Sequence, residues 1–314
     1  MSIPADSIAS QSGGSDHSER IAYIEQQVAP LVAEGEDVAG KPRSSLADRM
    51  AQAGAAGISV AVIEDGRIAW ARGYGVVEAG QPAPITPDTL FQCASISKPV
   101  AAVMALRLVE SGALTLDGDV NDALTSWQIP PITYWDGKGR VDKPLRVTLR
   151  QLISHTGGLT VHGFPGYPVG TPLPSLTTIL HGEPPANTPP IRVDTLPGVQ
   201  MRYSGGGYTV LTQLLEDVTG KPFPTLAQEL VLGPLGMRDS GFDQPLSPER
   251  ARRAAKAHHV HDHHAQPIPG GWHIYPELAP DGLWATPSDL ARFALGLQAA
   301  LAGEPGAILS QATM

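Results

Sequence analysis

An apolar run from Val100 to Val109 is interrupted only by Arg107, and Gly112 follows shortly after it. A helix through this run would be apolar on almost every side, which is typical of a helix buried inside a domain. Glycine is common directly after a helix because it readily adopts the left-handed conformation that ends one. The pattern therefore predicts a central, buried helix that ends near Gly112.

The segment Gly57–Gly75 alternates apolar and polar residues on both sides of the pair Asp65-Gly66. Asp-Gly between two such runs is a strong signal for a tight hairpin turn. The alternating apolar positions are Ile58, Val60, Val62, Ile68 and Trp70. We therefore expect an antiparallel strand pair with one face on a core.

Helical periodicity and capping residues mark further helices. Thr286-Pro287-Ser288-Asp289, for example, is a good N-terminal capping pattern. The helices expected are Ile21–Val32, Val147–His155, Tyr208–Val218, Phe223–Leu232 and Leu290–Leu301. By contrast, residues 1–17 are rich in Ser, Gly and Asp and predict a disordered tail.

The stretch Ser126–Gln200 is rich in Pro and Gly and contains only one short helical pattern. Irregular segments of this length are either functional, as lids or binding-site walls, or surface insertions without a role. The sequence leaves both interpretations open.

Composition narrows the possible partners and locations. The chain has 314 residues, 42% of them hydrophobic, and a net charge of −9, which predicts a single domain over 18–314 that binds neither nucleic acid nor an anionic membrane. The single cysteine, Cys93, cannot form an internal disulfide and is expected to be a buried packing residue. The polar N-terminus does not resemble a signal peptide, and no apolar stretch reaches the ~18 residues of a membrane span. A cytoplasmic location is therefore expected.

Ser95 and Lys98 stand directly in front of the apolar run, at positions i and i+3. At this spacing both side chains lie on one face of a helix and can touch. A neutral lysine can take the proton of a serine hydroxyl, and the free N–H groups at a helix N-terminus can bind the developing oxyanion. The alternative is a serine N-cap followed by a lysine that faces solvent, which the buried character of the helix disfavours.

Tyr203 precedes Ser204 and three glycines, in front of a predicted helix. A tyrosine on such a tight turn is either placed for chemistry or simply packed over the turn. Taken alone, the position favours packing.

Histidines occur in two places that resemble functional sites. His155 precedes Thr156-Gly157-Gly158, where we expect a helix C-terminus with the histidine on the last carbonyls. Residues 258–264, HHVHDHH, form a dense cluster, in which a strand would place His259, His261 and His263 on one face. Because no fixed ligand spacing is followed, a metal site is not expected there.

Several motifs occur in an order that resembles the serine β-lactamase-like family. They are FQCASISK around Ser95, LISHTGGL, PGVQMRYSGGGY, LGPLGM and GLWATPSDLARF. The family includes class C β-lactamases, D-Ala-D-Ala carboxypeptidases, D-stereospecific aminopeptidases and amidases, and related esterases. The resemblance covers about Ile58–Leu301.

This resemblance implies an α+β fold, with an antiparallel sheet flanked by helices and an all-helical lobe inserted at about residues 115–200. It also implies that Ser95 is the nucleophile, Lys98 its base and Tyr203 the residue that assists proton transfer to the leaving group. Gly205 stands where the family's Tyr-x-Asn motif has a substrate-binding asparagine. No metal or organic cofactor is implied.

Two departures from the family pattern affect the expected substrate. Gly205 replaces an asparagine that contacts the substrate amide in β-lactamases, which weakens the case for penicillin hydrolysis. The family's third motif, Lys-Thr-Gly or His-x-Gly, is not found before Met314, and the final ILSQATM resembles the start of a helix. The C-terminal strands and one oxyanion-hole N–H are therefore expected to be missing.

The function expected is hydrolysis of small ester or amide substrates through an acyl-enzyme, as in a carboxylesterase or amidase. Two alternatives remain open: a β-lactamase or D-Ala-D-Ala carboxypeptidase, and a non-catalytic penicillin-binding-like module or truncated fragment. The only partner implied is a small-molecule substrate, and the sequence leaves the oligomeric state open.

Overall fold

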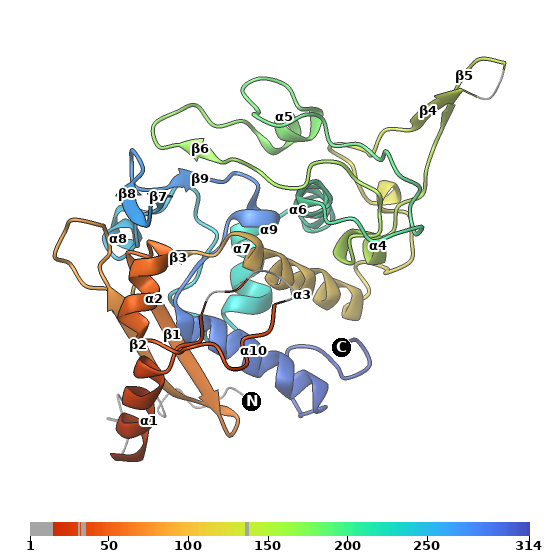
Figure 1. The fold of residues 1–314 in the computed structure, drawn as a ribbon. Helices are drawn as coiled ribbons and strands as arrows, with labels where there is room; N and C mark the ends of the chain where they lie inside the picture. Colours follow the sequence, from red (N-terminus) through yellow and green to blue (C-terminus); the bar gives the residue numbers. More distant parts are fainter. Residues whose placement is uncertain (1–14, 31, 33–35, 136–137) are drawn as a thin grey trace.

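The computed structural model describes residues 15–30, 32, 36–135 and 138–314 (Figure 1). The helices are α1 (Ser15–Gln26), α2 (Leu46–Ala53), α3 (Ser97–Glu110), α4 (Leu149–Ile153), α5 (Leu176–His181), α6 (Gly205–Thr219), α7 (Phe223–Ala227), α8 (Pro248–Ala251), α9 (Leu278–Asp281) and α10 (Pro287–Leu301). The strands are β1 (Gly57–Glu64), β2 (Arg67–Gly75), β3 (Phe91–Gln92), β4 (Ile132–Trp135), β5 (Arg140–Lys143), β6 (Tyr167–Pro168), β7 (His258–His261), β8 (His264–Pro267), β9 (His273–Ile274) and β10 (Trp284–Ala285). Ala94–Ile96 and Val120–Asp122 form 3₁₀ turns, and a π-helical turn over Gln228–Leu232 extends α7.

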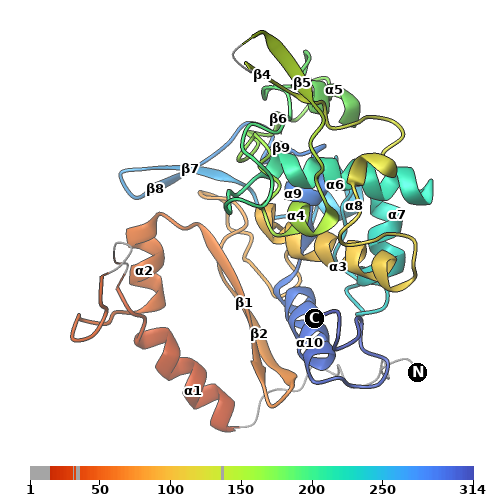
Figure 2. The ribbon, with the colours of Figure 1, turned by 90° about the vertical axis from the view of Figure 1, so that its right-hand side faces the viewer.

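The predicted hairpin is confirmed. β1 and β2 pair antiparallel, and Asp65 and Gly66 form the turn with φ values of 49° and 71°. Positive φ at both central residues is what a type I′ hairpin turn requires. Figure 2 shows this pair lying between α10 on one side and α1 with α2 on the other, so the helices cover both of its faces.

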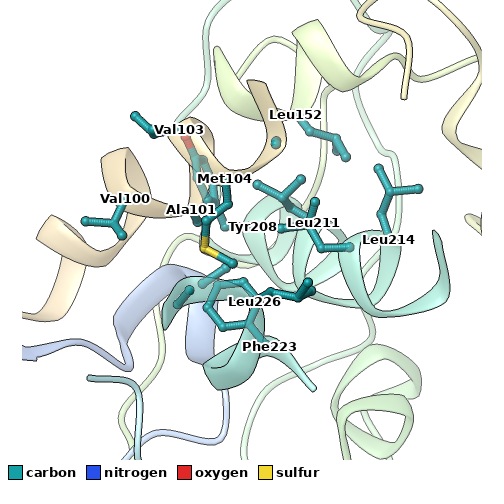
Figure 3. Packing of buried hydrophobic residues seen from close by; sticks show 14 of the residues in the cluster. Val100, Ala101, Val103, Met104, Leu152, Tyr208, Leu211, Leu214, Phe223 and Leu226 are labelled. Atoms are coloured by element: carbon teal, nitrogen blue, oxygen red, sulfur yellow. The ribbon is translucent and has the colours of Figure 1, made fainter. Parts of the chain in front are cut away.

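The predicted buried helix is also confirmed, as α3. Val100, Ala101, Met104 and Ala105 have no exposed surface. Figure 3 shows how residues of α3 meet apolar side chains of α4, α6 and α7, among them Leu152, Tyr208, Leu211, Phe223 and Leu226. These helices therefore hold α3 rigidly in the centre of the core.

The fold is α+β, as expected, with antiparallel strand pairs flanked by helices. In the described part of the chain the strands pair two by two: β1–β2, β3–β10, β4–β5, β6–β9 and β7–β8. Residues far apart in sequence are joined in this way, since β3 before Ser95 pairs with β10. This pairing brings the segment before α10 next to the start of α3.

The expectation of an all-helical lobe at residues 115–200 is wrong. The region contains the short helices α4 and α5, but also the β4–β5 hairpin, which projects from the body of the molecule (Figure 1), and β6. β6 pairs with β9, outside the lobe. The frequent Pro and Gly residues explain the difference, because they interrupt helices and favour turns.

Several predicted boundaries also need correction. α1 begins at Ser15, inside the predicted tail, and ends at Gln26 because Val28 pairs with Ser44 instead of continuing the helix; residues 1–14 of that tail lie outside the described residues. α4 is shorter than predicted, and α6 begins at Gly205 because Ser204 caps it by accepting a hydrogen bond from Gly207 N. The other two expected helices are present as α7 with its π-helical extension, and as α10 capped by Thr286.

The segment after α10 packs back on α3. Ile308 and Leu309 are buried, and Ser310 N and Thr313 Oγ1 donate hydrogen bonds to Glu110 Oε1 at the end of α3. Thr313 N and Met314 N donate hydrogen bonds to Ser310 O, which forms one turn over residues 310–314.

Among the described residues, every helix is too short or too polar to cross a bilayer.

Candidate active site

Ser95 lies in a tight turn that connects β3 to α3. The preceding Ala94 has a φ of 43°, in the left-handed region that residues other than glycine rarely adopt. Ser97 stabilises the turn, because its hydroxyl donates to Ala94 O at 2.6 Å and accepts from Leu283 N at 2.9 Å. The turn is thereby attached to the segment between α9 and β10, which fixes the Ser95 hydroxyl in one place.

Lys98 lies in the first turn of α3 and points at Ser95. Its Nζ donates to Ser95 Oγ at 2.9 Å and to Pro280 O at 2.9 Å, and only 5% of the side chain is exposed. The alternative of a lysine that faces solvent is therefore wrong.

Tyr203 is the second residue that donates a hydrogen bond to the Ser95 hydroxyl. Its hydroxyl donates to Ser95 Oγ at 2.7 Å, and Lys98 Nζ lies 4.9 Å from the centre of its ring. The three residues expected to carry the chemistry therefore meet at one oxygen atom, and Tyr203 is not merely a packing residue over the turn.

His155 supports Tyr203, which the sequence analysis did not foresee. The two rings stack with centroids 4.4 Å apart, and His155 Nδ1 accepts a hydrogen bond of 3.1 Å from Ser204 N. The ring therefore contacts Tyr203 and Ser204 N instead of the last carbonyls of α4, where it was expected. Burial, and then the charge of Lys98, lower the pKa of His155, so the neutral ring is favoured.

Asp281 lies at the site although no sequence pattern singled it out. It ends α9, it is 7% exposed, and its Oδ1 lies 3.4 Å from Ser95 Oγ and 3.6 Å from Lys98 Nζ. Burial raises the pKa of this carboxyl, although Lys98 and the Ser95 hydroxyl act in the opposite direction. No local pattern marks a lone aspartate as functional, and only the packing of α9 on α3 brings it to Ser95.

Gly205 forms the first residue of α6 and is buried. A side chain there would meet Phe164 Cε2 at 2.9 Å and His162 O at 3.0 Å. Phe164 and the His162 carbonyl therefore occupy the space that a side chain at position 205 would need. A role for Gly205 in substrate binding stays a prediction.

The histidine cluster and Cys93 were the other candidates for metal or thiol chemistry. In the part of the chain that the structure describes, no group of three His, Cys, Asp or Glu residues could hold a metal ion. The expected shared face of His259, His261 and His263 is wrong, because β7 and β8 form a hairpin that turns at residues 262 and 263. Cys93 is buried as expected, and burial raises its pKa to about 12.

The fold, with a serine and a lysine at the head of a buried helix, is that of the β-lactamases and penicillin-binding proteins. The chain belongs to the Beta-lactamase family, whose family model matches residues 43–314.

Comparison with individual proteins gives relatives of several activities. Esterase EstB of Burkholderia gladioli is 32% identical over 216 residues, covering 66% of this chain and 50% of EstB. The D-alanyl-D-alanine-carboxypeptidase/endopeptidase AmpH of Escherichia coli is 27% identical over 255 residues, covering 80% of this chain and 60% of AmpH. The structure of EstCE1, a hydrolase with promiscuous acyltransferase activity, superposes with a TM-score of 0.66 at 24% identity, covering 85% of this chain and 73% of EstCE1. The chain thus spans about half to three fifths of the length of the curated relatives it matches.

Proposed function

We propose that the protein is a serine hydrolase that acts on small ester or amide substrates through an acyl-enzyme. The observation that carries the proposal is the position of Ser95 Oγ, 2.9 Å from Lys98 Nζ and 2.7 Å from the Tyr203 hydroxyl. A serine hydroxyl needs an adjacent proton acceptor to become a nucleophile, and the two hydrogen bonds hold it in one orientation.

In this mechanism Ser95 Oγ attacks the carbonyl carbon, and the Ser95 N–H, in the 3₁₀ turn that leads into α3, helps to bind the oxyanion. Lys98, as the family resemblance implies, takes part in removing the serine proton, and Tyr203 delivers a proton to the leaving group. Water then attacks the acyl-enzyme and releases the acid.

Two observations favour esters or simple amides over β-lactams. Gly205 offers no side-chain amide to hold a substrate amide, and Phe164 occupies the space of such a side chain. EstB, at 32% identity, is named an esterase.

The second candidate is a β-lactamase or D-Ala-D-Ala carboxypeptidase. AmpH matches a larger share of the chain, 80%, although at 27% identity.

The proposal is tested by turnover of p-nitrophenyl acetate and nitrocefin, together with covalent labelling by a fluorophosphonate. Hydrolysis of the ester without hydrolysis of nitrocefin supports the proposal. Nitrocefin hydrolysis would support the second candidate, labelling without turnover would indicate a penicillin-binding-like module, and no reaction at all would contradict both enzymatic candidates.

A further inference from the structure

We propose that Asp281 is a further catalytic residue, whose carboxylate, paired with Lys98, receives the proton that Ser95 loses during acylation. This inference rests on the proposed serine hydrolase function, and it names the final acceptor of the proton within that site.

The direction of the hydrogen bonds around Ser95 Oγ supports this role. Lys98 Nζ and the Tyr203 hydroxyl both donate to this oxygen. The Ser95 hydroxyl itself donates to Asp281 Oδ1 at 3.4 Å. Among the described side chains that contact Ser95 Oγ, Asp281 is therefore the one placed to accept its proton.

The pairing of Asp281 with Lys98 explains why the carboxylate, rather than a neutral amine, provides the acceptor. An ammonium has three N–H donors, and Lys98 Nζ faces Ser95 Oγ, Pro280 O and Asp281 Oδ1. The side chains are only 5% and 10% exposed, and a charge buried to this extent needs an opposite charge nearby. Before the reaction, the pair is best described as an ammonium beside a carboxylate.

The proton balance is the same whether the transfer is direct or passes through Lys98. As Ser95 Oγ forms its bond to the acyl carbon, the Ser95 O–H bond breaks. In the direct route the serine proton moves to Asp281. In the relayed route it moves to Lys98 while Lys98 passes one of its own protons to Asp281. The pair then consists of an ammonium and a carboxylic acid. The acid returns this proton, through Lys98 and Tyr203, to the leaving group, and the carboxylate is restored before water attacks.

The surroundings of Asp281 suit a base that works near neutral pH. Lys98 on α3 faces it with a positive charge, the Tyr203 hydroxyl shares Ser95 with it, and Tyr208 on α6 lies beside Lys98. Before α9, Asp281 acts on Tyr275 and Glu277 through its charge. Burial dominates over these neighbours and raises the pKa of Asp281, which brings it closer to the range in which a general base is most effective.

The test measures the rate of fluorophosphonate labelling of Ser95 in the full chain and in two variants. Asp281→Asn keeps the shape of the side chain but removes the acceptor, and it is expected to slow labelling by at least ~100-fold, the usual scale for a positioned general base. Glu216→Gln on α6 is the matched control: the same carboxyl-to-amide change at a half-buried group whose pKa burial also raises, without a contact to Ser95. It is expected to label at the wild-type rate, and thermal melts check that both variants fold.

Labelling of Asp281→Asn within about threefold of the wild-type rate would overturn the inference and leave the proposed function intact. A wild-type chain that is not labelled at Ser95 would overturn the proposed function and the inference with it.

If Asp281→Asn does not fold, the pH profile of wild-type labelling decides. A carboxylate base predicts a rate that is level from about pH 7 to about pH 9 and falls on the acid side. A rate that keeps rising over that range would identify a neutral amine as the acceptor and contradict the inference.

Discussion

The hydroxyl of Tyr203 donates a 2.7 Å hydrogen bond to the hydroxyl of Ser95, a residue 108 positions earlier in the chain. The ring of His155 stacks on the ring of Tyr203, and the ring of His162 packs against Tyr203 at a tilt. The phenol is therefore preorganised toward the serine by groups that do not touch Ser95 themselves.

Removing this hydroxyl in Tyr203→Phe should slow acylation of Ser95 by about 10–100-fold, because the proton donor to the leaving group is lost. The ring still stacks on His155, so the melting temperature should change little. Pre-steady-state hydrolysis of p-nitrophenyl acetate measures the acylation step. A wild-type rate would show that the Tyr203 hydroxyl has no part in the reaction.

Replacement of Lys98 by methionine should destabilise the protein in a pH-dependent way. The change leaves the Asp281 carboxylate buried without a partner, which typically costs about 3–5 kcal/mol. Burial raises the pKa of Asp281, so the carboxyl can become neutral at low pH and the loss should be smaller at about pH 5 than at about pH 8. Urea unfolding at both pH values measures the difference. The double variant Lys98→Met/Asp281→Asn should recover much of the stability, and equal losses in the single and double variants would contradict this account.

His155→Ala should slow labelling of Ser95 by about tenfold without abolishing it, because Tyr203 loses the ring that orients it and Ser204 N loses its acceptor. His155→Phe keeps a ring of similar breadth and should retain more of the rate. The comparison of labelling rates in the two variants separates ring stacking from the hydrogen bond. Identical rates in both variants would mean that stacking on Tyr203 contributes nothing.

Glu277 should make the stability of the protein fall as the pH rises. The side chain has no exposed surface, its carboxyl oxygens have no partner among the other described residues, and burial raises its pKa to about 8. A raised carboxyl pKa contributes stability below the unfolded value, and that contribution is lost as the pH rises toward about 8.

Glu277→Gln removes this titration. The variant should therefore be more stable than the wild type above pH 8 by at least about 1 kcal/mol, and the two should differ less near pH 5. Thermal melts across this range provide the measurement. A wild type that is as stable at high pH as at low pH would show that Glu277 is solvated or paired.

Local patterns were sufficient to predict the parts of the fold that depend on neighbouring residues. The Asp65-Gly66 turn and the apolar run behind Ser95 are of this kind, because each is determined within a few positions along the chain. The lobe was predicted incorrectly, since β6 is stabilised by β9, a strand far away in sequence.

Residues of the candidate site that stand in a sequence motif could be predicted. Residues that only the packing of the chain brings to the site could not. Ser95, Lys98 and Tyr203 stand in motifs whose order suggested a shared site, and the structure brings them together. Asp281 reaches the site because α9 packs on α3, and His155 reaches it by stacking on Tyr203. Neither feature can be derived from residue spacing.

The most direct test of the central claim is labelling of the wild-type chain and of Ser95→Ala by a fluorophosphonate, with the modified residue identified by mass spectrometry. One labelled residue, Ser95, is expected in the wild type, with complete loss of labelling in the alanine variant. Labelling that persists in Ser95→Ala, or an unlabelled wild-type chain, would contradict that claim.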